Sequence, residues 1–269
     1  NPSSLDGERV RDLVTLGVNR LSIGVQSLAA ERLRFVERLH DPRAARAAVE
    51  AALAAGVRVS ADLIFGMATE RGPTSVAEAA AEATALASLG VGHVSAYALT
   101  IESNTPFGER ARRGRLPLLS EDAATSTFTA VAAALAEQGL ERYEVSSFAR
   151  PGERSRHNLG TWRGHDYLGL GAAAVGTVTL PDGCATRYQN PSDPLRYLTT
   201  VGRGLLDASE REKLDPETRM RERIMLGLRI PVPKVEASAP NGRPWRAIVA
   251  QPTYLVALFG AATGYGVMI

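Results

Sequence analysis

The chain has 269 residues and is 45% apolar, which is enough to build one sizeable domain or two smaller ones around a hydrophobic core. Its 31 basic and 29 acidic residues are spread along the sequence and give a formal net charge of +2, so nucleic acid is not an expected partner. The single cysteine, Cys184, excludes an internal disulfide and any cluster held by several cysteines of this chain. It fits a reducing compartment, by default the cytoplasm.

Residues 1–99 alternate between helical and strand patterns. The spacing of apolar residues predicts helices over 6–16, 30–39, 42–55 and 74–89. Strands are predicted over 19–26, 57–65 and 93–99, and in the first of them Leu21, Ile23 and Val25 alternate with small or polar residues. Repeated helix–strand units predict an α/β fold in which crossover helices join parallel strands into a curved or barrel-like sheet.

After Thr100 the pattern becomes a smaller α+β mixture. We expect a polar loop over 101–106, a helix over 121–138, a strand over 143–148 and a loop over 156–162. A hairpin follows over 176–179 and 186–189, and then helices over 192–202 and 216–228. We therefore divide the chain into residues 1–105, residues 106–230 and an apolar tail, residues 231–269.

Two polar residues stand out in the predicted parallel sheet. Gln26 ends its strand, and Asp62 interrupts an apolar strand, where an ionised carboxylate is costly unless it is paired or bound to a ligand. Because ligands bind at the carboxyl ends of such strands, the amide and the carboxylate should face one ligand and suit ribose hydroxyls or an ammonium group. The alternative is a surface Gln26 and an Asp62 satisfied by arginine or by backbone donors.

Three other candidates are less distinctive on their own. Arg38, in the last turn of the predicted helix, is also explained as a solvated charge that the helix dipole favours. The run from Gly169 to Gly171 lacks the glycine spacing of a phosphate loop. His157, next to Asn158 in a polar loop, is either a surface histidine or a ligand of a metal or a haem iron.

Five segments, in this order, resemble radical S-adenosylmethionine proteins of the oxygen-independent coproporphyrinogen III oxidase type, and within them the haem-chaperone branch. They are residues 18–27 (VNRLSIGVQS), 62–66 (DLIFG), 97–105 (YALTIESNT), 143–149 (YEVSSFA) and 157–162 (HNLGTW). The resemblance implies the carboxyl-terminal half of a partial (β/α)6 barrel, TIM-like in architecture, followed by an α+β region. It also implies three ligands for the parent protein: a 4Fe-4S cluster, S-adenosylmethionine and haem, the last passed to a haem-accepting protein.

Carried over by position, Gln26, Arg38 and Asp62 match family residues that contact S-adenosylmethionine. The last motif is associated with haem, which makes His157, Asn158 and Trp162 candidate haem-binding residues and His157 the candidate iron ligand. Thr161 departs from the tyrosine that the family has in this motif. Two alternatives to haem transfer stay open: oxidative decarboxylation of coproporphyrinogen III by a 5′-deoxyadenosyl radical, and an inactive truncated product.

Both ends of the chain depart from the family. The three-cysteine loop that holds the cluster would lie before Asn1, so we expect an amino-terminal truncation, with no cluster ligand in this chain. From Pro231 the sequence no longer resembles the family, and residues 252–269 are uncharged. They are either the start of a transmembrane helix, the one expected route to membrane contact, or an apolar terminal helix. Nothing in the sequence gives the oligomeric state.

Overall fold

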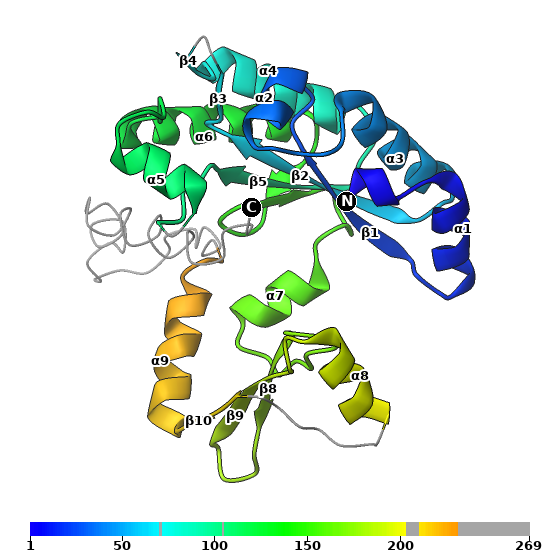
Figure 1. Ribbon diagram of the computed structural model, residues 1–269, viewed down its shortest axis with the longest axis vertical. Helices are drawn as coiled ribbons and strands as arrows, with labels where there is room; N and C mark the ends of the chain where they lie inside the picture. Colours follow the sequence, from blue (N-terminus) through cyan, green and yellow to red (C-terminus); the bar gives the residue numbers. More distant parts are fainter. Residues whose placement is uncertain (70–71, 104, 203–209, 231–269) are drawn as a thin grey trace, which may run out of the picture. The chain divides into compact units, whose positions relative to one another are not determined.

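The computed structural model describes residues 1–69, 72–103, 105–202 and 210–230. Its largest sheet has five strands in the order β1-β2-β5-β7-β6. The first three, β1 (Arg20–Gln26), β2 (Arg58–Phe65) and β5 (His93–Ala98), are parallel. The other two, β7 (Ser147–Ala149) and β6 (Glu141–Arg142), continue the sheet with antiparallel pairing (Figure 1). The expected α/β fold with parallel strands is therefore confirmed.

Several helices of this part of the chain begin at a residue whose side chain caps them. Asp6 caps α1 (Gly7–Thr15), and Asp41 caps α3 (Pro42–Ala54), which has proline at its first position. Ser75 and Glu78 form a capping box at the start of α4 (Val76–Ala87). The remaining elements of this part are η1 (Pro2–Ser4), α2 (Ala30–Phe35), the small β3 (Ala68–Thr69) and β4 (Gly72–Pro73) pair, α5 (Pro106–Arg112) and α6 (Glu121–Glu137).

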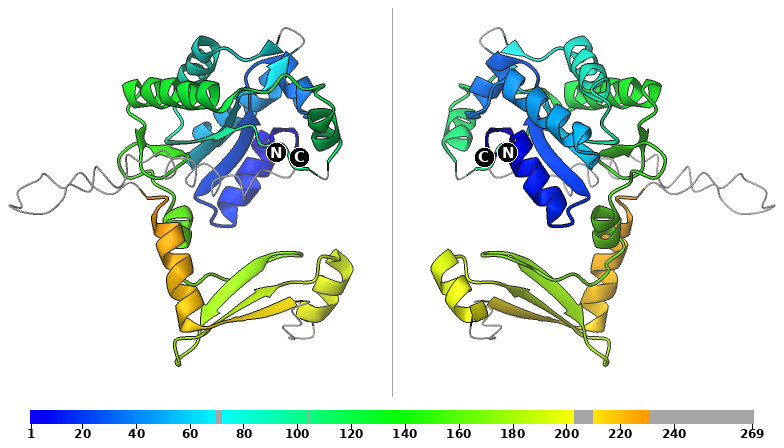
Figure 2. Two further views of the ribbon diagram at one scale, coloured as in Figure 1. Left: turned by 90° about the vertical axis from the view of Figure 1, so that its left-hand side faces the viewer. Right: turned by 90° about the vertical axis from the view of Figure 1, so that its right-hand side faces the viewer.

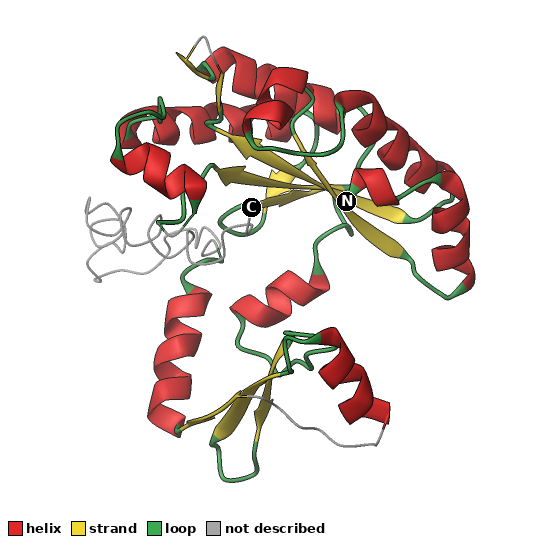
Figure 3. Ribbon diagram, in the orientation of Figure 1, coloured by secondary structure: helices red, strands yellow, loops and turns green. Residues whose placement is uncertain are grey.

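One face of the sheet forms the hydrophobic core. Helices α3, α4 and α6 lie along it (Figure 3), and the sheet contributes buried side chains at alternate positions, such as Ile23, Leu63 and Val94. Phe148 is fully buried, with its ring centroid 6.2 Å from that of Phe128 on α6. Because strand side chains alternate, the intervening positions of β1, β2 and β5 face the other side, and many of them are polar.

Residues 155–230 belong to a second compact unit. An antiparallel sheet in the order β10-β9-β8 is formed by β8 (Val175–Thr179), β9 (Ala185–Gln189) and β10 (Glu210–Leu214). Helices α8 (Pro194–Gly202) and α9 (Pro216–Gly227) lie at opposite ends of this sheet, and α7 (Arg156–Trp162) packs against α9 (Figure 2). Arg187 of β9 ties the sheet to α9 through Glu222, at 2.7 Å.

Several predicted elements differ from those observed. The helix predicted over 30–39 ends at Phe35, because Glu37 takes a left-handed conformation with φ of 53°. The predicted loop over 156–162 is helix α7, which starts from a Ser155 cap. Helix α5 and strand β10 were not predicted, and only Ser147 and Phe148 of the predicted 143–148 strand are in β7. The expected boundaries at 105/106 and 230/231 stay predictions.

The expectations for residues 231–269, including a membrane-spanning start at 252–269, lie outside the described residues. Within the described part of the chain, no helix is both long and apolar enough to cross a bilayer.

Candidate functional site

A row of polar side chains crosses the face of the large sheet opposite the helices. In the β-sheet register Asp62 on β2 pairs with Ser95 on β5, and Ser95 pairs with Ser147 on β7. Tyr97 lies two residues further along β5, toward its carboxyl end. The Ser147 hydroxyl is buried and has no hydrogen-bond partner in the described part of the chain. Only Asp62 of this row was singled out from the sequence, although the alternation of His93, Ser95 and Tyr97 along the strand was a readable signal.

Asp62 is held in an environment that disfavours its charge. Burial raises the pKa of its carboxyl group from 3.8 to about 6, although a hydrogen bond from the Ser95 side chain lowers the pKa in part. The nearby Tyr97 has its pKa raised to about 12, first by burial and then by the Asp62 charge. A carboxylate in this position gains most from a ligand that brings hydrogen-bond donors or positive charge to it.

Gln26 lies at the carboxyl end of β1 in an unusual backbone conformation. Its φ is +64°, and Ser27 N donates to Val25 O at 2.8 Å, so Gln26 is the centre of a left-handed γ-turn. Its side-chain amide lies over Gly24, where an added Cβ would stand 2.7 Å from the Gln26 nitrogen. The Gln26 Oε1 atom is buried and accepts no hydrogen bond from any residue that the structure describes. Within this part of the chain it is therefore a buried acceptor without a donor.

His40 also holds this turn, through a hydrogen bond to the Val25 carbonyl. The His40 ring is buried, and its Nε2 lies 3.1 Å from Val25 O, so that nitrogen carries the proton and donates to the carbonyl. Gln26 itself pairs with Leu63 after an irregularity in the β1–β2 register. This places Gln26 and Asp62 on adjacent strands at neighbouring levels, as expected from the sequence.

Arg38 follows α2 in a Schellman-type ending rather than in a helical turn. Its backbone N–H donates to Leu33 O at 2.9 Å across the left-handed Glu37. The Nε and Nη2 atoms of Arg38 are buried and have no hydrogen-bond partner among the described residues, and burial lowers the pKa of the guanidinium. A partly buried guanidinium with such donors fits an anionic ligand group such as a carboxylate. The predicted helical position of Arg38 was wrong, while its proposed role as a ligand contact stays a prediction.

A second polar network lies at the opposite, amino-terminal end of β5. The buried His93 ring bridges the Ser60 hydroxyl at 2.7 Å and the Tyr143 hydroxyl at 2.7 Å. Burial, aided by the Arg20 charge, lowers the pKa of His93 to about 3, so the ring is neutral. Both ring nitrogens of His93 are hydrogen-bonded to side chains of the same unit, so we interpret this network as structural.

In the second unit, the haem candidates lie on α7. His157 is exposed, and Asn158 takes part in the helix cap, its N–H donating to Ser155 Oγ at 3.2 Å. The ring of Trp162 stacks under the Arg229 guanidinium, whose carbon is 4.6 Å from the ring centroid. Trp162 is thus engaged inside its own unit, and its buried Nε1 atom meets no hydrogen-bond acceptor among the residues that the structure describes.

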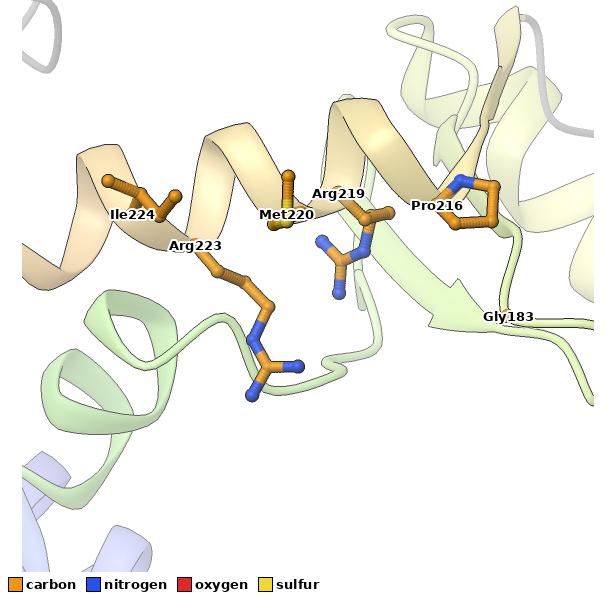
Figure 4. Close-up of a pocket in the computed structure, with 6 residues that line it drawn as sticks. All are labelled: Gly183, Pro216, Arg219, Met220, Arg223 and Ile224. Carbon is orange, nitrogen blue, oxygen red and sulfur yellow. The ribbon is translucent and has the colours of Figure 1, made fainter.

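The same unit has a shallow hollow of about 380 Å³ along α9 (Figure 4). It is lined by Gly183, Pro216, Arg219, Met220, Arg223 and Ile224. Arg219 is already engaged, because it donates to Gly164 O at 3.1 Å and lies 3.5 Å from Glu222. The stem of Arg223 crosses the Gly164 backbone, where an added Cβ would stand 2.5 Å from its Cγ.

Comparison with known proteins gives a consistent family. Residues 1–72 match the family model "Radical SAM superfamily". The chain is 37% identical over 200 residues to the haem chaperone HemW of Escherichia coli K12, covering 74% of this chain and 50% of that protein. It is 35% identical over 231 residues to HemW of Mycobacterium tuberculosis H37Rv, covering 86% of this chain and 57% of that protein. The chain thus spans about half the length of these relatives.

The fold comparison agrees. The coproporphyrinogen III oxidase HemN of Escherichia coli, a radical SAM enzyme, superposes with a TM-score of 0.65 at 20% identity, over 85% of this chain and 54% of that one. The α/β sheet described above is therefore part of the radical SAM fold.

The residues of this chain fit S-adenosylmethionine but do not fit a 4Fe-4S cluster, the two groups that the family implies. Gln26 Oε1 and two Arg38 nitrogens have no partner among the described residues, and together with the Asp62 carboxyl group they offer acceptors and donors that suit S-adenosylmethionine. A 4Fe-4S cluster finds no such fit: Cys184 is the only thiol in the sequence, and the described residues contain no group of three His, Cys, Asp or Glu suited to a metal ion. The sequence and fold comparisons together support the HemW- and HemN-like radical S-adenosylmethionine family for this chain.

Proposed function

We propose that this chain is part of a cytoplasmic haem chaperone that binds haem and passes it to an acceptor protein, with S-adenosylmethionine bound on the large sheet. The observation that carries the proposal is the 35–37% identity to proteins named as haem chaperones over at least 200 residues. The 230 residues aligned with HemW of Bacillus subtilis, at 31% identity, support it further.

On the large sheet, the proposed roles follow from the unused polar atoms. The Asp62 carboxylate accepts hydrogen bonds from ligand hydroxyls, and the Gln26 amide adds an acceptor at the end of β1. The Arg38 guanidinium binds the ligand's carboxylate. Bound S-adenosylmethionine in this family supplies radical chemistry together with a 4Fe-4S cluster, whose ligands this chain does not provide. The residues described here hold and orient the cofactor.

In the second unit, His157 is the proposed haem ligand. Its exposed imidazole is free to approach a haem iron, and neutral imidazole is a common axial ligand. Asn158 and Trp162 line the same helix and are proposed to support the haem. The haem is cargo in this proposal, so an accessible ligand suits its transfer better than a buried one.

Haem titration tests this role directly. Hemin added to the purified chain should give a Soret band, and His157→Ala should weaken the apparent affinity at least about tenfold, which is 1.4 kcal/mol. His165→Ala is the matched control, because His165 is also an exposed histidine of the same unit. The assignment fails if His157→Ala binds hemin like the unaltered chain, or if His165→Ala weakens binding equally.

The alternative function is oxidation of coproporphyrinogen III, as in the enzyme that shares the fold. Fold similarity at 20% identity does not carry an activity, so this alternative rests on family kinship alone. The two functions differ in a measurable way, since one predicts haem binding without turnover and the other predicts turnover.

A further inference from the structure

The turn that presents Gln26 requires support from the rest of the fold. A non-glycine residue with a φ in the left-handed range is strained, and a γ-turn with positive φ at its centre is rare for that reason. Gln26 has both features, with φ of +64° and the Ser27 N to Val25 O hydrogen bond. Its backbone would relax unless neighbouring groups fixed the residues on either side.

Glu82, on helix α4, forms hydrogen bonds that hold the residues after Gln26 in place. One of its carboxylate oxygens, Oε1, accepts hydrogen bonds from the Ser27 hydroxyl and from Leu28 N, the latter at 2.6 Å. The other, Oε2, lies 2.5 Å from the Arg32 guanidinium of α2. Ser27 Oγ in turn accepts from Ala29 N at 3.1 Å. The two residues that follow Gln26 are therefore bonded to one carboxylate on α4.

This arrangement is buried. Ser27 is 0% exposed, Arg32 is 6% exposed and Glu82 is 9% exposed. A buried carboxylate is costly unless every oxygen is paired, and Glu82 is paired with one charged donor, one hydroxyl and one backbone N–H. The rest of α4 consists mainly of alanine, so neither helix propensity nor core packing requires glutamate at this position.

We infer that Glu82 is a positioning residue for the cofactor site: by holding Ser27 and Leu28, it keeps Gln26 left-handed and its amide over Gly24. The cofactor part of this inference rests on the proposed function. The conformational part does not, because it concerns the turn itself. A carboxylate with only a structural role would stabilise α2 against α4 without controlling the Gln26 conformation.

The conformational part is tested on the chain without ligand. The Glu82→Gln side chain keeps its volume but is neutral and has only one acceptor oxygen. Either Arg32 or the Ser27 and Leu28 donors therefore lose their acceptor, and the contact between α4 and the turn weakens. NMR couplings and Cα shifts should show Gln26 leaving the left-handed region, and hydrogen exchange at the Leu28 amide should accelerate at least about tenfold. The control is Glu78→Gln, since Glu78 approaches the same Arg32 at 3.6 Å from a side chain that is 56% exposed.

Two outcomes overturn this part: an unchanged positive φ at Gln26 together with unchanged Leu28 exchange in Glu82→Gln, or equal effects in Glu78→Gln. If Glu82→Gln does not fold, Glu82→Asp replaces it, because the shorter side chain keeps the charge but withdraws it from Leu28. The same two readouts then decide.

The cofactor part is tested by a double-mutant cycle in S-adenosylmethionine affinity, measured by calorimetry. Glu82→Gln should weaken binding about tenfold in the unaltered chain but less than about twofold in a Gln26→Ala background, since a positioning residue acts through the group it positions. Equal losses in both backgrounds would overturn the inference. If the unaltered chain binds no S-adenosylmethionine, the proposed function fails, and the NMR measurement still judges Glu82.

Discussion

The charge of Asp62 should make the fold less stable as pH rises. Burial raises the folded-state pKa of this carboxyl group from 3.8 to about 6. A raised folded-state pKa means that the folded chain favours the protonated form, so the associated stability is fully present below pH 3.8. It is lost as pH rises through about 6. At 1.36 kcal/mol per pKa unit, the rise in the Asp62 pKa from 3.8 to about 6 lowers the free energy of unfolding by roughly 3 kcal/mol above pH 7.

Asp62→Asn removes the charge and keeps an acceptor for Ser95, so it isolates this effect. Urea unfolding between pH 4 and pH 8 should show the variant more stable than the unaltered chain by about 2 to 3 kcal/mol at pH 8, and nearly equal to it at pH 4. Asp12→Asn, on the exposed side of α1, should stay within about 0.5 kcal/mol throughout. A variant that is less stable at pH 8 would refute the reasoning, because it would mean that the Asp62 carboxylate is already stabilised by a partner.

Three further predictions concern the same sheet. Asp62→Ala should weaken S-adenosylmethionine binding by about 1 to 3 kcal/mol in calorimetry, the scale for losing a buried polar partner, whereas unchanged affinity would make Asp62 structural. Gln26→Gly should raise the free energy of unfolding in urea by about 0.5 to 1 kcal/mol, because glycine adopts a φ of +64° without strain. The same substitution should weaken cofactor binding, because it removes the side-chain amide. A lower free energy of unfolding would contradict the first expectation. His93→Phe should destabilise the fold by about 2 to 4 kcal/mol at pH 7.5, since it leaves the Ser60 and Tyr143 hydroxyls without their partner. That deficit should shrink at pH 4.5. The pKa of His93 is lowered from 6.5 to about 3 in the folded chain, so the stability that the neutral ring gives the unaltered chain is present above pH 6.5 and is lost as pH falls toward 3. A deficit that does not change with pH would contradict this.

The three parallel strands of the large sheet were predictable because their signal is local. Ile23, Leu63 and Val94 mark the buried face at every second residue, and the polar residues between them mark the other face. The same alternation predicts Gln26 and Asp62 on successive strands at similar heights. Ser95 and Tyr97 follow the same alternation, but neither is a charged residue inside an apolar strand, which is the feature that marks Asp62.

Features without a signal in the residue type, and features that depend on distant contacts, were not predictable. The end of α2 is set by the left-handed Glu37, and glutamate gives no such signal, so the predicted helix runs to Leu39. The importance of Glu82 appears only when α4 packs next to the turn after β1. Strand β10 was missed because its sequence is mainly charged, and its pairing with β9 and the contact between Arg187 and Glu212 become evident only in three dimensions.

The most direct test of the central claim is a paired assay on the product of the complete gene, reconstituted with iron and sulfide. One aliquot is titrated with haem, and a second is incubated with coproporphyrinogen III, S-adenosylmethionine and a reductant. Our account predicts stoichiometric haem binding with a Soret band and no protoporphyrinogen. Formation of protoporphyrinogen with little haem binding would contradict it.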